Sequence, residues 1–170
     1  MPAIVCLLAA AWSLLGLAAE SVPEYDLKAA FVFNFIQFTS WPESVSAEAG
    51  ALAICASPGT PLYPALSSLV GKSAHGRKIA VRPLIEEQLR LCQVVFLTAA
   101  DRERLPQIRK NLAGGSTLVI GDSPEINREG VIIALAVEGG RIVFDIDISA
   151  ARRMNLSISS RLLRLARSVQ

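Results

Sequence analysis

Beyond the almost entirely apolar first nineteen residues, hydrophobic and polar positions first follow a helical period. Between residues 25 and 38, apolar side chains recur at every third or fourth position, at Leu27, Phe31, Phe35 and Phe38. This spacing predicts a helix with one apolar face, and Asp26 and Lys28 mark its solvent-exposed side. The dipeptide Trp41-Pro42 is expected to end the helix, because a residue before proline avoids helical geometry.

Short continuous apolar runs come next, each bounded by turn residues. Such runs are typical of strands that are buried on both faces of a parallel sheet. We expect four of these strands, at residues 51–56, 78–84, 93–97 and 116–120. Helical segments are expected between them, at 63–70, 85–89 and 101–113, the last with Asp101 as its N-cap. This alternation predicts an α/β fold with right-handed crossovers.

The pattern changes after residue 130. Apolar runs at 131–137 and 141–146 flank Gly139-Gly140, which predicts an antiparallel hairpin. A helical spacing then extends from Met154 to Val169, and Ser149 is its expected N-cap. The predicted fold is therefore a single three-layer α/β domain, in which a mostly parallel sheet is flanked by helices and followed by a C-terminal antiparallel hairpin and a closing helix.

The first nineteen residues form a separate block, which is uncharged and almost entirely apolar. Its length and the small-x-small pattern at residues 16–18 are typical of a secretory signal peptide. We expect residues 1–18 to be removed by cleavage after Ala18, or alternatively after Ala19, and residues 20–170 to form the domain. No Lys or Arg precedes the apolar run, so an upstream start codon and a retained N-terminal anchor stay open as alternatives.

Composition and charge exclude several classes of protein. The 170 residues are 52% hydrophobic, and 17 Lys and Arg against 15 Asp and Glu give a net charge of +2. An apolar fraction this high is not that of a disordered chain. A net charge so close to neutral gives no electrostatic case for a nucleic-acid partner.

Export changes the interpretation of the cysteines. Cys6 lies within the expected leader, so the mature chain holds Cys55 and Cys92. An even pair in an oxidising compartment favours a disulfide, and two separate buried thiols are the alternative. Cys55 lies late in its predicted strand and Cys92 just before another, so parallel neighbours would hold them apart. With His75 as the single histidine, we expect no metal site and no cofactor.

Three short motifs resemble catalytic or phosphate-binding sequences. Gly71-Lys72-Ser73 ends like a P-loop, but Leu66 stands where that motif needs a glycine, so we expect a turn. Ser123 follows a strand, but Glu125 replaces the glycine of a nucleophile elbow, and only His75 is available as a base. Asp145 and Asp147 face one side of the last strand as a potential acid–base pair, and capping or solvation accounts for them more simply. We therefore expect no enzyme.

The predicted closing helix is strongly basic. Its arginines are Arg152, Arg153, Arg161, Arg164 and Arg167, and the last three are spaced by three residues, which predicts a ridge along the helix. A solvated helix face is the simplest interpretation. An acidic partner or an anionic membrane surface is the more specific one.

Several blocks of this sequence occur together in a known family. The first is YDLKAAFVFNFIQFTSWP at residues 25–42, with the pattern Tyr-x-hydrophobic-Lys-Ala-Ala-Phe and a final Trp-Pro. The others are at 53–55, 69–82, 92–97, 118–122, 140–145 and 158–166. In this order, they resemble the YfiR family of periplasmic proteins across nearly the whole expected mature chain.

The resemblance implies a periplasmic regulator without catalysis or cofactor. In this family, a regulator of this kind represses an inner-membrane diguanylate cyclase (YfiN-like) by contacting its periplasmic sensor region. An outer-membrane lipoprotein (YfiB-like) captures the regulator and relieves the repression, which controls cyclic di-GMP and biofilm formation. Cys55 and Cys92 match the family's shared cysteine pair, and a further C-terminal pair of the type member is absent from this sequence.

The resemblance and the basic helix together give a candidate contact surface at Arg152, Arg153, Arg161 and Arg164. A homodimer would suit a dimeric membrane receptor. The alternative function is a periplasmic binding module for a small ligand, or an accessory of a sensor kinase.

Overall fold

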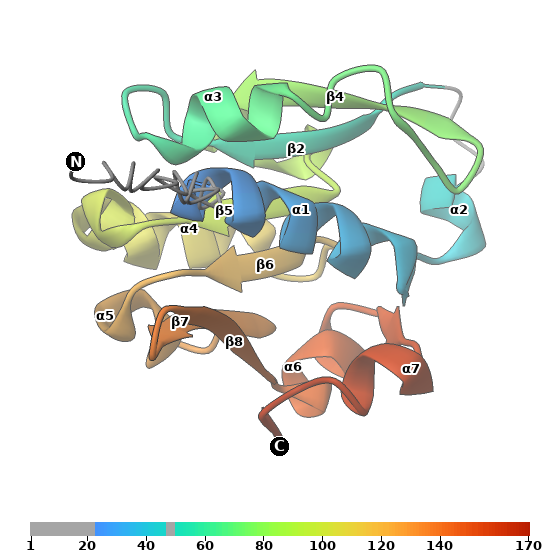
Figure 1. The fold of residues 1–170 in the computed structure, drawn as a ribbon. Coiled ribbons are helices and arrows are strands. Elements are labelled where there is room, and N and C mark those ends of the chain that lie inside the picture. Colours follow the sequence, from blue (N-terminus) through green and yellow to red (C-terminus); the bar gives the residue numbers. More distant parts are fainter. Residues whose placement is uncertain (1–22, 47–49) are drawn as a thin grey trace, which may run out of the picture.

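A computed structural model describes residues 23–46 and 50–170, so the expected leader and Cys6 lie outside the described residues. Figure 1 shows a curled sheet with helices on both faces, and this confirms the predicted α/β class. Within the described residues the sheet has eight strands, in the order β10-β8-β7-β6-β5-β2-β4-β3. They are β2 (Leu52–Ala56), β3 (Ser73–Ala74), β4 (Arg77–Pro83), β5 (Val94–Leu97), β6 (Leu118–Gly121), β7 (Ile133–Glu138), β8 (Arg141–Ile146) and β10 (Ser168–Val169).

The centre of the sheet is parallel and both of its ends are partly antiparallel. Strand β2 lies between β4 and β5, and β5, β6 and β7 continue the parallel arrangement. The predicted hairpin is present as β7 and β8, paired from Ile133↔Ile146 to Glu138↔Arg141. The short strand β10 then pairs in parallel with the outer edge of β8, and β3 pairs antiparallel with β4.

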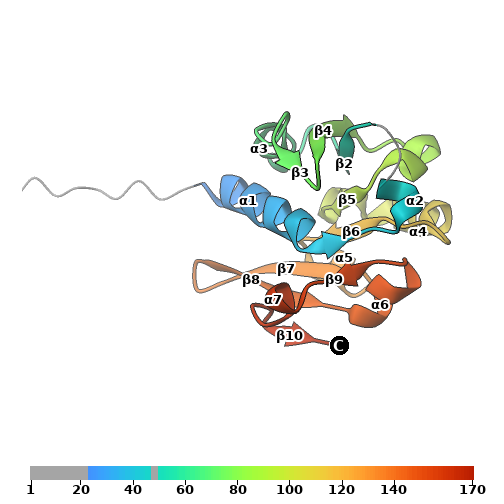
Figure 2. The same ribbon diagram turned by 90° about the vertical axis from the view of Figure 1, so that its right-hand side faces the viewer.

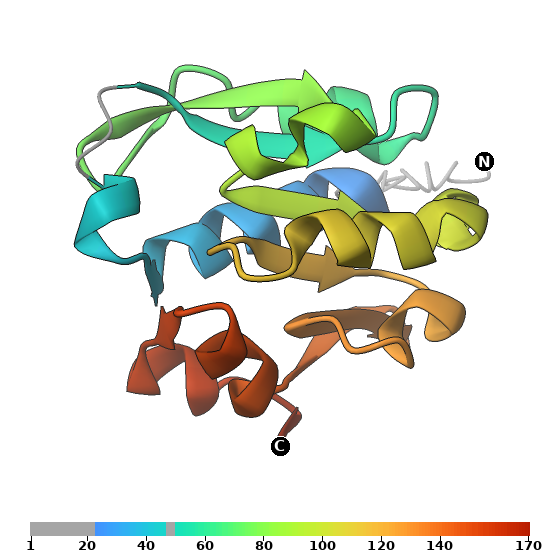
Figure 3. The same cartoon turned by 180° about the vertical axis from the view of Figure 1, so that it is seen from behind.

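Two layers of helices cover this sheet. Helices α1 (Glu24–Gln37) and α3 (Leu62–Ser67) lie on the face seen in Figure 1. The opposite face, seen in Figure 3, carries α4 (Leu105–Leu112) and the 3-10 helix η1 (Glu86–Leu91). The remaining segments are α2 (Glu43–Ser46), η2 (Ala99–Arg104), α5 (Pro124–Asn127), α6 (Ile148–Arg153) and α7 (Ser160–Leu163). No helix in the described part of the chain is both long and apolar enough to cross a bilayer.

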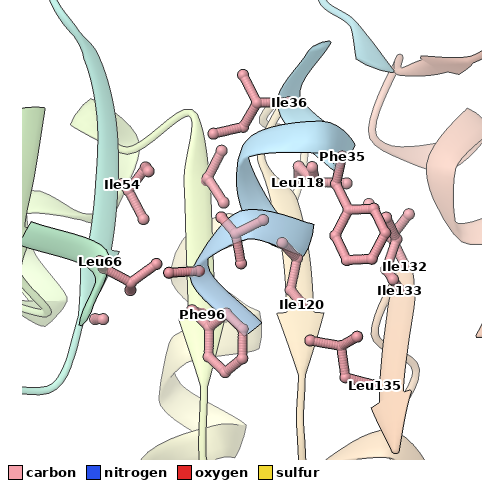
Figure 4. Close-up of a cluster of buried hydrophobic side chains, with 14 of the residues drawn as sticks. Phe35, Ile36, Ile54, Leu66, Phe96, Leu118, Ile120, Ile132, Ile133 and Leu135 are labelled. Carbon is pink, nitrogen blue, oxygen red and sulfur yellow. The ribbon is translucent and has the colours of Figure 1, made fainter. Parts of the chain in front are cut away.

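Each central strand divides its side chains between two hydrophobic clusters, which explains the continuous apolar runs. Figure 4 shows Phe35 and Ile36 of α1 packed beside Phe96, Leu118 and Ile120 of the sheet. Alternate residues of the same strands form the second cluster, on the face covered by α4. The domain is therefore held by a core on each side of one sheet.

The orientation of α1 differs from the prediction. The buried stripe runs through Lys28, Val32, Phe35 and Ile36, whereas Leu27 and Phe31 are only partly buried. Lys28, Phe35 and Ile36 are each three or four positions from Val32, so these buried residues share one helix face. The prediction placed Lys28 in solvent because a charged side chain is usually exposed, and it was wrong because Lys28 has acidic partners inside the fold.

Two predicted N-caps were also wrong. Thr98, not Asp101, begins the helical segment after β5, and Asp101 takes the third position of a reciprocal capping box with Thr98. Asp147, not Ser149, caps α6, where its carboxylate accepts the Ala150 N–H at 2.7 Å. In each case the neighbouring candidate lies two or three residues from the observed cap.

The predicted closing helix is interrupted. Helix α6 ends at Arg153, and Asn155 has a positive φ of 54°, which no helix accommodates. The chain then forms β9 (Ser157–Ile158), which pairs antiparallel with β1 (Thr39–Ser40) just after α1. Figure 2 shows β1, the short strand that directly follows α1, beside β9. Helix α7 and strand β10 complete the chain, so the arginines that were predicted on one helix are distributed over several elements.

Candidate functional site

Four exposed arginines, called here the arginine surface, lie at the C-terminal end of the domain. Arg152 and Arg153 form the last turn of α6, Arg161 lies in α7, and Arg164 is the C-cap residue of α7. Strand β9 joins the two helices, and its pairing with β1 fixes them relative to α1. The surface therefore belongs to folded elements and not to a free tail.

The arginine surface has almost no internal charge compensation. No ion pair connects Arg152, Arg161 or Arg164 to any other described residue, and Arg153 is 3.7 Å from Asp147. The sequence from residue 148 to the end contains no Asp or Glu. Leu165, directly after Arg164, is 70% exposed. This region thus combines uncompensated positive charge with an apolar side chain, a composition that suits binding to an acidic protein surface.

Arg167 does not join this surface, contrary to the predicted ridge. Its guanidinium forms ion pairs with both Asp145 and Glu138, and Ser168 Oγ donates a hydrogen bond to Asp145 at 2.8 Å. These contacts hold β10 against β8. The Arg167 hydrogen bond keeps the pKa of Asp145 below its ordinary value, although partial burial acts in the opposite direction. Asp145 therefore anchors the last strand.

We expect acid to loosen the last strand through Asp145. Because the pKa of Asp145 is lower in the folded state than in the unfolded state, its contribution to stability is complete above its ordinary pKa of 3.8. It is lost as the pH falls below that value and through the folded-state pKa. The N–H groups of Arg167 and Gln170 donate to the carbonyls of Phe144 and Ile146 on β8. Amide exchange, corrected for the intrinsic rate, should show weaker protection of these two amides at pH 3 than at pH 5. In Asp145→Asn, protection should be weak at both pH values, and a wild-type profile in that variant would contradict the assignment.

The two cysteines of the expected mature chain are joined by a disulfide. Cys55 lies in β2, and Cys92 directly follows η1, with a Cα–Cα separation of 5.8 Å. The parallel register sets Cys55 opposite Val95, three residues after Cys92. The expected separation was wrong, because η1 ends at Leu91 and the chain does not extend the line of β5 back through Cys92, which lies beside Cys55 instead.

A second polar cluster lies where β2, β5 and β6 end, and no sequence pattern predicted it. Lys28 Nζ is 2.7 Å from Glu24 and 3.1 Å from Asp122, which follows β6. Burial would lower the pKa of Lys28, but the hydrogen bond with Glu24 and the charge of Asp122 outweigh it and raise that pKa. Burial dominates for Asp122 and raises its pKa despite Lys28.

The neighbouring loops are tied by a buried carboxylate. Asp101 is completely buried and accepts hydrogen bonds from the Ser57 hydroxyl, the Thr98 N–H and the Arg104 guanidinium. A cavity of about 300 Å³ adjoins this cluster, with Lys28 and Asp122 in its wall. Carboxyl ends of parallel strands are the usual ligand sites of α/β sheets. Here the charged groups form ion pairs and hydrogen bonds with one another. The cluster therefore holds α1 and the loops after β2 and β5 to the sheet.

The residues considered for catalysis have structural contacts of their own. Ser123 caps α5, and its hydroxyl accepts the Ile126 N–H at 3.4 Å. His75 Nε2 lies 2.8 Å from the carbonyl of Ile36, near the C-terminal end of α1, whereas Ser123 adjoins Asp122 at the opposite end. About 12 Å of helix separates Lys28, which contacts Asp122, from Ile36, which contacts His75. Within residues 23–46 and 50–170, no three potential metal-ligating side chains come together.

Similarity to solved structures is limited to the fold. A conserved domain protein from Vibrio cholerae O1 biovar El Tor strain N16961 is similar, with a TM-score of 0.52 and 13% identity over 86% of this chain and 60% of that chain. The ABC domain from Streptococcus pneumonia, solved in complex with L-Trp, has a TM-score of 0.50 and 7% identity over 71% of this chain and 55% of that chain. The chain thus spans less than two thirds of either structure.

Sequence comparison with protein families is more informative. No curated protein matches the chain. A family model described as YfiR/HmsC-like (DUF4154) matches residues 25–167, which extend from the start of α1 to the residue before β10. This family consists of periplasmic regulators of cyclic di-GMP signalling, which act with partner proteins and not by catalysis. Over nearly its whole described length, the chain therefore belongs to the YfiR/HmsC-like family.

Proposed function

We propose that this protein represses an inner-membrane diguanylate cyclase (YfiN-like) from the periplasm. In this proposal, the leader directs export and is cleaved after Ala18 or Ala19, and residues 20–170 remain as the regulator. The regulator binds the cyclase's periplasmic sensor region through the arginine surface and stabilises the inactive conformation. A ligand that prefers one conformation shifts the equilibrium toward it without any catalytic residue. Family membership supports this general mode of action.

The single observation that carries the proposal is the uncompensated charge of Arg152, Arg161 and Arg164. Positive charges that form no ion pair with another described residue favour an acidic partner surface and accelerate association with it. Leu165 provides an exposed apolar group beside them. The fixed geometry limits the conformational entropy that binding costs, because α6 and α7 are already folded.

Relief of repression follows from competition in this proposal. An outer-membrane lipoprotein (YfiB-like) that binds the regulator lowers the concentration available to the cyclase. A symmetric homodimer of the regulator would present the arginine surface twice, which matches a dimeric receptor.

Complementation of a gene deletion tests the proposal. Deletion should raise cellular cyclic di-GMP, and the wild-type gene should restore the original level. A triple variant with Arg152→Glu, Arg161→Glu and Arg164→Glu should accumulate in the periplasm but fail to restore it, because repulsion replaces attraction at three positions. Crosslinking in intact cells should recover the cyclase with the wild-type protein and much less of it with the triple variant.

The matched control changes the same charge elsewhere on the surface. Arg82, Arg90 and Lys110 are exposed, lie outside the C-terminal segment and have no ion pair with another described residue. Their replacement by glutamate should leave complementation intact. Cyclic di-GMP that does not change on deletion would contradict the proposed function. Equal failure of both triple variants would reject the arginine surface as the specific contact.

A further inference from the structure

An apolar cavity of about 360 Å³ opens on the sheet face opposite α1, between α4 and α6. Its floor includes Leu97 of β5 and Val119 of β6, and its walls include Ile108 of α4 and Met154 after α6. Figure 3 shows this face of the sheet, with α4 lying over the strands and running along them. The volume is within the range of pockets that bind small molecules.

The exposure of Val119 shows that the helices leave this face of the sheet incompletely covered. Strand β6 lies between β5 and β7, where both faces are ordinarily covered. Its residues Leu118 and Ile120, which face α1, are completely buried, whereas Val119 on the opposite face is only partly buried. An aliphatic ligand in this space would remove that remaining apolar surface from water, which is favourable.

The walls favour an aliphatic ligand over an aromatic one. Leucine, isoleucine, valine, alanine and methionine supply the apolar lining, and none of the described residues that line the cavity is aromatic. Stacking therefore offers no advantage to a ring. Met154 is unbranched and partly buried, so it can adapt to a chain of variable length.

The rim of the cavity selects for negative charge. Arg109, Glu129 and Arg153 are its charged residues, so the rim has a net charge of +1. Arg109 is paired with Glu129 at 3.2 Å, whereas Arg153 has one long contact, 3.7 Å from Asp147. Arg153 is 65% exposed and is the cation most available to a ligand. A guanidinium matches the planar geometry of a carboxylate.

We propose that this cavity binds a medium-chain carboxylate, with its hydrocarbon chain against Val119 and Met154 and its carboxylate at Arg153. This inference goes beyond the repressor function, and its binding step does not depend on a partner. Because Arg153 also belongs to the arginine surface, a bound carboxylate would neutralise one of the charges proposed to contact the cyclase.

Calorimetric titration of the purified protein with hexanoate, octanoate and decanoate, each below its micellar concentration, tests the proposal. The Kd should fall about fourfold for each added methylene until the cavity is filled, because each methylene leaves water for an apolar wall. An alkylammonium ion of equal chain length should bind more weakly than the carboxylate. An affinity that is independent of chain length, or equal for the ammonium ion, would overturn the proposal.

Two kinds of variant locate the site. Arg153→Gln should weaken decanoate binding about tenfold, since a charged hydrogen-bonding partner is lost. Its matched control is Arg152→Gln, the adjacent exposed arginine of α6 that does not line the cavity, and binding to that variant should be unchanged. Equal weakening in both variants would indicate general charge attraction and reject the site.

Filling the cavity provides the second kind of variant. Val119→Phe should abolish decanoate binding while the thermal transition shows a folded protein. Met154→Phe narrows the same cavity from its wall and tests the site if position 119 in β6 does not accept the larger ring. Undiminished binding to a folded filling variant would place the carboxylate elsewhere and overturn the proposal.

Discussion

Replacement of both Cys55 and Cys92 by alanine is expected to lower the free energy of unfolding by about 4 kcal/mol. The disulfide joins residues 37 positions apart, and in the chain-entropy model a crosslink of this span removes that amount of conformational freedom from the unfolded chain. For a domain of this size, the midpoint of thermal unfolding should fall by about 10 °C. Urea unfolding of the oxidised wild type and of the double variant measures the difference.

The wild type under reducing conditions is the first control, and its unfolding midpoint should approach that of the double variant. Ser57→Ala provides a second comparison, because the Ser57 hydroxyl donates to Asp101 and also ties the end of β2 to the segment after β5. Since both links connect the same two strands, we expect the two losses to be non-additive. A double-alanine variant with the wild-type midpoint would show that the crosslink does not restrict the unfolded chain.

The strands could be predicted from the sequence because the burial of a strand is visible in the pattern of its own residues. A central parallel strand is covered on both faces, so β2 and β5 appear as unbroken apolar runs, and Gly139-Gly140 marks the hairpin. The C-terminal segment has helical spacing but does not form one helix. Its interruption depends on the pairing of β9 with β1, more than 100 residues earlier, and no local periodicity contains that contact.

The polar contacts were less predictable for the same reason. The sequence identified a basic C-terminal segment, and Arg152, Arg161 and Arg164 are indeed exposed there. It could not separate Arg167 from them, because Asp145 and Glu138 meet Arg167 only after β10 docks on β8. Charged residues are usually solvated, so a single sequence gives no reason to pair residues far apart in the chain.

Lys28 is the clearest example, and Lys28→Met is expected to lower the free energy of unfolding by about 3 kcal/mol. Its side chain is 7% exposed and that of Asp122 is 10% exposed, and they come from positions 94 residues apart. Removal of the ammonium leaves the Asp122 carboxylate desolvated and without its cation, which is the costly way to break a buried ion pair. Urea unfolding at pH 7 measures the loss. Lys110→Met, which changes an exposed lysine of α4, should cost well under 1 kcal/mol.

The pH dependence of this loss separates an unpaired charge from lost packing. Burial already raises the pKa of Asp122 in the presence of Lys28, and removal of Lys28 takes away the influence that lowers it. A carboxyl whose pKa is higher in the folded state binds more protons when folded, so its contribution to stability declines as the pH rises. The deficit of Lys28→Met should therefore be smaller at pH 5 than at pH 8, and the added change Asp122→Asn should remove most of that difference. A deficit that is equal at both pH values would mean that Lys28 supports the fold through the packing of its methylenes and not through its charge.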